Sequence, residues 1–156
     1  MLSWRSAADA QDRRRDDNFE LERRRVQLDM RIDAYAEHLA ALDRAIARSD
    51  ELLRAVTAQR PRKVARLLIS TETTLDRHDT AWTRTALVAC DEYRSVAAGA
   101  RALLDEIRTV GTATSPRGAK KLRRDTIAQL RTLHVQLTEV ARLELRLDTP
   151  DSPDQA

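Results

Sequence analysis

The chain has 156 residues, of which 42% are hydrophobic and 34% charged, and its formal net charge is +3. Aromatic residues make up 3%, and there are only three glycines and four prolines. This composition argues against β-sandwich and doubly wound α/β folds, which need frequent turn residues and β-branched strands. It favours a helix-on-helix core built from Leu, Ala, Val and Ile.

A second set of classes is disfavoured by the cysteine count and by the apolar runs. The single cysteine, Cys90, cannot form an internal disulfide, which argues against a disulfide-stapled secreted module. The longest apolar runs span about five residues, whereas a membrane span needs about 20. Residues 1–5 lack the apolar region of a signal peptide. We therefore expect a cytoplasmic protein without a transmembrane segment.

The helix breakers divide the chain into three. All prolines and all glycines except Gly99 lie at Pro61, within 111–118 or within 150–153. This spacing predicts an all-α, elongated antiparallel bundle of three long helices at about 8–59, 62–110 and 117–147. The bundle would form one domain over 1–147, in which 1–27 is a charged and partly protruding helix start. The tail, 148–156, is expected to be a disordered acidic segment.

The first helix has the clearest periodicity. Apolar residues recur at alternating steps of three and four, with one polar interruption at Ser49, which is typical of a coiled-coil seam. The seam consists of Ile32, Tyr35, Leu39, Leu42, Ile46, Ser49, Leu53 and Val56.

The register of the second helix leads to a prediction of self-association. If it runs back continuously from Pro61, residues whose numbers sum to about 121 face each other, and Val96 lies opposite Arg25. The third helix then leaves much of the seam uncovered, and an exposed apolar face of that width usually marks an interface. We predict a homodimer, the commonest closed assembly, formed through four residues of the seam: Leu42, Ile46, Leu53 and Val56. The alternative is a monomer whose second helix breaks within 70–80, a segment rich in Ser, Thr and Asp, and covers the seam with a fourth helix.

Candidate chemistry is sparse. None of the histidines, His38, His78 and His134, follows a glutamate by three residues, as a ferritin-like metal pair would require. His78, between Asp76 and Asp79, is expected at a polar kink or on the solvated surface, and His134 in the core or at an interface. No phosphate loop, nucleophile elbow or zinc spacing occurs. The sequence therefore predicts no enzyme activity, no metal and no cofactor.

Two windows of the chain are basic and contain no acidic residue. Residues 52–71 hold five cations and residues 107–124 hold six, and both windows fall at predicted helix–helix turns. Each window places cations at a helix N-terminus, which the helix dipole disfavours by roughly 0.3–1 kcal/mol per charge. An arrangement that costs stability suggests an anionic partner, although turns of an Arg-rich chain are often basic merely because they are solvated. The candidate binding residues are Arg60, Arg62, Lys63, Arg66, Arg117, Lys120, Lys121, Arg123 and Arg124.

The sequence thus favours a non-enzymatic helical interaction, scaffold or assembly protein that associates with itself and with another protein. The alternative is an Arg-rich protein that binds nucleic acid or an anionic surface through its basic turns. Binding to nucleic acid is expected to be weak and not sequence-specific, because aromatic residues do not interleave with the cations and no helix-turn-helix pattern occurs.

Overall fold

The computed structural model describes residues 3–110 and 115–147, and within these ranges the chain is helical apart from its turns. Four helices follow one another: α1 (Ser3–Thr57), α2 (Pro61–Ala86), α3 (Asp91–Val110) and α4 (Pro116–Leu147). None of them, over its described residues, contains a stretch long and apolar enough to cross a membrane. The all-α prediction is confirmed, but the prediction of three long helices is wrong, because the helix expected over 62–110 is two helices. The predicted tail, 148–156, lies outside the described residues.

The unpredicted turn, residues 87–90, reverses the chain without glycine or proline. Two backbone N–H groups of this turn bond back to the carbonyl of Thr85 and close α2. Cys90 then begins α3, since its carbonyl accepts the first hydrogen bond of the new helix. Asp91 and Glu92 occupy the first turn of α3, where the helix dipole favours negative charge. The break therefore follows from capping and charge.

The segment 70–80, where a break was predicted instead, is continuous helix. The hydroxyl groups of Thr73, Thr74 and Thr80 each donate to the carbonyl oxygen four residues earlier, at distances of 2.7–3.0 Å. Each hydroxyl shares a carbonyl that stays within the helix, so it does not form a competing turn, although such a bond slightly destabilises a helix. The helix consequently tolerates a sequence with low intrinsic propensity.

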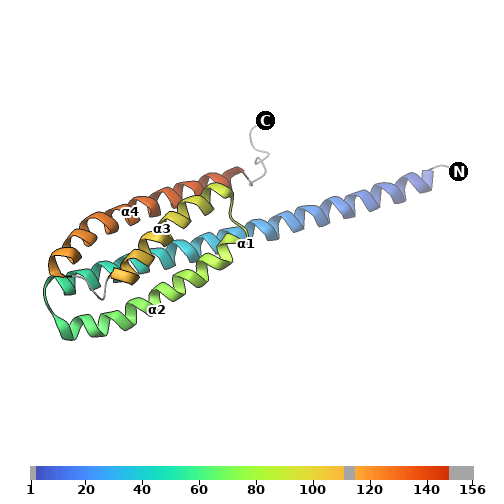
Figure 1. Ribbon diagram of the computed structural model, residues 1–156. Helices are drawn as coiled ribbons and strands as arrows, with labels where there is room; N and C mark the ends of the chain where they lie inside the picture. Colours follow the sequence, from blue (N-terminus) through green and yellow to red (C-terminus); the bar gives the residue numbers. More distant parts are fainter. Residues whose placement is uncertain (1–2, 111–114, 148–156) are drawn as a thin grey trace.

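The four helices form an up-and-down bundle in which α1 is the longest helix and the others lie along its C-terminal half (Figure 1). The α2 and α4 helices pack against α1, and α3 packs mainly against α4. The predicted register of α1 and α2 is confirmed by an ion pair that joins Glu37 to Arg84 at 3.2 Å. The prediction that Val96 faces Arg25 is wrong, because the reversal at 87–90 carries α3 in the opposite direction, back over the bundle.

The first half of α1 projects beyond the other helices (Figure 1). We call residues 3–30 the arm, which is about 40 Å long at the rise of an α-helix. Phe19, Leu21, Val26 and Met30 lie on the arm, and each is more than half exposed. The bundle therefore leaves apolar side chains of the arm uncovered.

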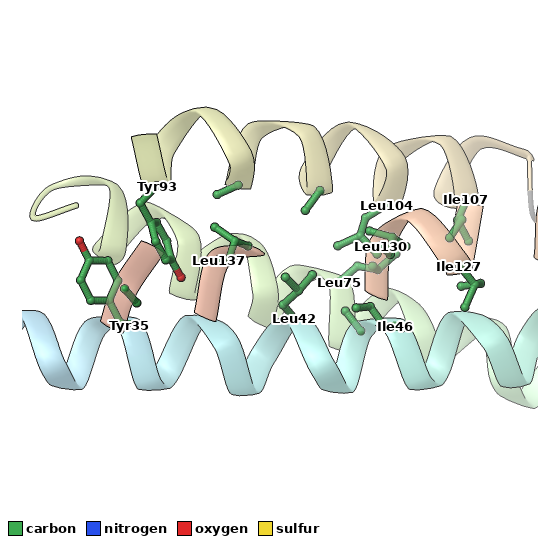
Figure 2. Close-up of a cluster of buried hydrophobic side chains, with 14 of the residues drawn as sticks. Tyr35, Leu42, Ile46, Leu75, Tyr93, Leu104, Ile107, Ile127, Leu130 and Leu137 are labelled. Atoms are coloured by element: carbon green, nitrogen blue, oxygen red, sulfur yellow. The ribbon is translucent and has the colours of Figure 1, made fainter. Parts of the chain in front are cut away.

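Apart from Ile32, which is 42% exposed, the α1 seam lies in the interior of the chain's own bundle. Figure 2 shows Leu42 and Ile46 of α1 among apolar side chains from the other helices, such as Leu75 and Leu137. Relative exposure is 0% for Leu42, 4% for Ile46 and 0% for Leu53, while Val56 is half-buried. The reasoning that led to a dimer through these residues is thus wrong: α2, α3 and α4 of the same chain cover the seam, so it is not an exposed face.

Candidate anion-binding site

Both basic turns lie at the same end of the bundle. The reversal at 87–90 returns α3 toward the C-terminal end of α1, so that α4 begins close to where α1 ends (Figure 1). An ion pair of 2.6 Å between Arg123 on α4 and Asp50 on α1 fixes this placement. A continuous helix over 62–110 would instead have put the second basic turn far from the first. We call the residues 54–66 and 115–131 together the basic end.

The first basic turn is held by its backbone. Gln59 adopts a positive φ of 52°, and the N–H groups of Gln59 and Arg60 bond back to the carbonyls of Val56 and Ala55. This pattern is the Schellman motif, in which a left-handed residue ends a helix. Pro61 follows at the first turn of α2, where the missing N–H costs nothing.

The cations of this first turn differ in their partners. Lys63 pairs with Glu51 at 3.2 Å, and its hydrogen bond lowers the pKa of the Glu51 carboxyl. Arg60, Arg62 and Arg66 are exposed, and no hydrogen bond or ion pair joins their side chains to any other residue that the structure describes. Three cations of the first turn therefore point to solvent.

The second basic turn opens α4. Ser115 caps the helix, because its Oγ accepts a hydrogen bond from the Gly118 N–H at 3.2 Å. Arg117, Lys120 and Lys121 are exposed on the first two turns of α4. No acidic residue lies in the first turn to offset them. This helix start therefore has positive charge added to the positive end of its dipole.

The cations of α4 surround an open hollow of about 870 Å³. Its charged lining consists of Arg117, Lys120, Lys121, Arg123, Arg124, Arg131 and a single acid, Asp50. The predicted residues of the first turn, Arg60, Arg62, Lys63 and Arg66, do not line it. The structure thus assembles five of the nine predicted cations in one concave surface and leaves the other four beside it.

Asp50 organises the inner wall of this hollow. Its carboxylate lies 2.6 Å from Arg54 and from Arg123 and 3.7 Å from Arg131, so three guanidinium groups converge on one buried acid. Three positive charges facing one negative charge leave an excess that a second anion would neutralise. Asp50, Arg54 and Arg131 were not among the predicted residues. The arginine at position 54, four residues after Asp50, was the only local signal, and such pairs are common on helices.

Two other cations of the second window are already neutralised. Arg124 bonds its neighbour Asp125 and thereby lowers the pKa of that carboxyl. Arg108 lies away from the hollow and ties α3 to α2, through ion pairs of 3.0 Å with Glu72 and with Asp76. The net charge of the window 107–124 is therefore larger than the positive charge that is free to meet a ligand.

A separate polar cluster is buried near the reversal at 87–90. His38 of α1 is 0% exposed and its Nδ1 lies 2.8 Å from the Tyr93 hydroxyl of α3. The ring of His78, from α2, is centred 5.1 Å from that of His38 and is 1% exposed. The prediction of a solvated or kinked position for His78 is wrong, because the continuous α2 turns this residue toward α1. His134 of α4 is half-buried, with Nε2 3.3 Å from the Leu39 carbonyl oxygen.

The chemistry of this cluster is that of neutral rings. Burial, together with the nearby rings of His78 and His134, lowers the pKa of His38 to about 4. Burial also lowers the pKa of His78. The described residues include no group of three or more His, Cys, Asp or Glu side chains placed to hold a metal ion.

Comparisons with known proteins add no relative: no family model, no curated protein and no solved structure matches this chain. The class that the fold and the site define is an all-α helical bundle with a basic, concave end.

Proposed function

We propose that this protein is a non-enzymatic helical binding protein whose basic end engages a polyanionic partner. The observation that carries the proposal is the convergence of two separate basic turns on one end of the bundle. The second turn borders a hollow with six cations and one acid, and the first turn lies beside it. Clustered charge of one sign in a concave surface raises the local concentration of oppositely charged ligands and speeds their association. A cytoplasmic location belongs to the same proposal.

Retention on a heparin column tests the proposal. A basic-end variant with Arg62→Gln, Arg66→Gln, Lys120→Gln and Lys121→Gln should elute at clearly lower salt than the unmodified chain. These four side chains are exposed, so the fold should survive, which far-UV circular dichroism checks.

A matched control removes the same charge from the arm, with Arg14→Gln, Arg15→Gln, Arg23→Gln and Arg24→Gln. It should elute close to the unmodified chain, because its cations stand among acidic neighbours. Equal loss of retention in both variants would show that total charge, and not the basic end, governs binding.

Self-association is a second candidate function, and the uncovered arm favours it over the buried seam. Ile32, at the start of the α1 seam, and Leu21, on the arm, lie on the same face of α1 as the buried core and are both exposed, so a second copy would extend an existing packing face. Residues 14–33 hold six arginines and six acidic residues, so two arms would not repel each other by net charge.

Light scattering distinguishes this candidate. If arms pair through this face, Leu21→Asp with Ile32→Asp should convert a dimer into a folded monomer, because both side chains are exposed and neither belongs to the bundle core. A monomeric unmodified chain at high micromolar concentration would rule out pairing through the arm.

A further inference from the structure

Five of the six cations of the hollow follow one face of α4. Arg117, Lys120, Lys121, Arg124 and Arg131 are spaced by three, four and seven residues, which places them along a single side of a helix. All five are exposed. From the first to the last, the row is about 21 Å long at 1.5 Å per residue. We call these five residues the α4 row.

The length of the α4 row bears on the shape of its ligand. A compact phosphate would meet cations at one turn of the helix only and would leave the rest of the row unused. One strand of a nucleic acid duplex presents a phosphate about every 3.4 Å along the axis, so a row of about 21 Å runs beside roughly six phosphates. Ala128 fills the one gap in the row with a methyl group, which lets a backbone approach closely.

The other side chains of the hollow further restrict the class of ligand that it can bind. Besides the charged groups, its lining consists of Ser115, Gly118, Ile127 and Ala128, and it contains no aromatic ring on which an unpaired base could stack. Ile127 is buried in the core, so no bulky apolar side chain of the hollow is free to insert into a lipid surface. Asp50 is engaged by three arginines and does not face the row as a free negative charge.

We propose that the α4 row binds the phosphate backbone of double-stranded nucleic acid along its length, without reading the bases. This proposal rests on the proposed function and names its partner. Contacts of this kind position a protein on a duplex but carry no sequence information. Arg124 is excluded because it is bonded to Asp125 at 2.8 Å. Arg131 is counted because its ion pair with Asp50 is long, at 3.7 Å, and its side chain is 64% exposed. Arg117, Lys120, Lys121 and Arg131 therefore supply four contacts.

Fluorescence anisotropy with a labelled, mixed-sequence DNA duplex tests the inference on the full chain. Four phosphate contacts predict that affinity falls about a hundredfold between about 50 and 200 mM salt. The variant Arg117→Gln, Lys120→Gln, Lys121→Gln should bind at least tenfold more weakly at the lower salt, and its salt dependence should drop to about threefold or fourfold.

The matched control is Arg60→Gln, Arg62→Gln, Arg66→Gln, which removes the same charge from the other turn of the basic end. It should stay within about threefold of the unmodified chain, because these side chains lie outside the hollow. If this control loses as much affinity as the α4 variant, the assignment to the α4 row is wrong.

Three competitors separate the inference from the proposed function. Tripolyphosphate or a single strand of equal length that competes as well as the duplex, at equal phosphate concentration, would overturn the duplex inference while leaving a polyanion site intact. Anionic vesicles that bind more tightly than the duplex would do the same. Absence of binding to the duplex, to heparin and to these competitors would overturn the proposed function itself.

Discussion

Acidification should destabilise this protein. Among its neutral groups, the buried imidazole of His38 should contribute most to that loss of stability. His38 is fully buried between the helices and burial is the main cause that lowers its pKa to about 4, whereas an unfolded chain holds a histidine near 6.5. Between these two pH values the unfolded chain binds a proton that the folded chain does not, so stability falls as the pH falls. The difference between the folded and unfolded pKa values of His38 corresponds to about 3 kcal/mol of folding stability. This stability is present in full above about pH 6.5 and is lost by about pH 4.

The measurement is the free energy of unfolding in urea, followed by circular dichroism at several values between about pH 7 and pH 4.5. Ion pairs that involve carboxylates also weaken in this range, so the informative quantity is the difference between the unmodified chain and His38→Gln. Glutamine does not titrate. The variant is expected to be less stable near pH 7, and its deficit should shrink by about 2 kcal/mol as the pH approaches 4.5.

Tyr93→Phe is the matched control, because it removes the hydroxyl group that lies 2.8 Å from His38 Nδ1 but leaves the ring buried. Its free energy of unfolding should fall by about 1 kcal/mol, with the steep pH dependence unchanged. If His38→Gln and the unmodified chain lose stability in parallel over the whole pH range, the burial of His38 is not the source of acid sensitivity.

Three substitutions test the fold itself by urea unfolding. Ser49→Ala should raise the free energy of unfolding by about 1 kcal/mol, because the Ser49 hydroxyl is buried with no hydrogen-bond partner among the described residues; a loss of stability would reveal a partner. Gln59→Gly should add about 1 kcal/mol, since glycine adopts a positive φ without strain, whereas Ala58→Gly, at a position where φ is not positive, should not stabilise the chain. Leu42→Ala should cost about 2–5 kcal/mol at any protein concentration; a cost that depends on concentration would restore an interface role for this residue.

The sequence determined the helical class, the helix starts at Pro61 and Pro116 and the register between the first two helices. Pro61 and Ser115-Pro116 are local signals with a fixed stereochemical meaning, and the helices begin where they predict. The pairing of Glu37 with Arg84 follows from a short turn alone, because two antiparallel helices joined by a few residues must align in order.

The reversal at 87–90 was beyond this reasoning, because no breaker marks it. The acidic pair Asp91-Glu92 was a usable signal for a helix start, yet it is as common on an exposed helix surface. What ends α2 is capping together with the burial gained when α3 folds back to cover the α1 seam. That gain in burial involves residues far apart in the chain, so local helix propensity does not reveal it.

The candidate site, like the fold, was visible in the sequence only in part, and the tertiary structure decided the rest. The cations were visible in the sequence as two acid-free windows, since charge is a local property. Their convergence on one end required the reversal, and Asp50 became a centre for three arginines only when α4 packed beside α1. Likewise, the sequence placed His78 on the surface because its neighbours Asp76 and Asp79 are polar, whereas packing against α1 buried it. Composition and hydrophobic period therefore determined which segments are helices. The tertiary contacts alone decided which charges pair and which polar groups are buried, because pairing and burial depend on distances between residues that lie far apart in the sequence.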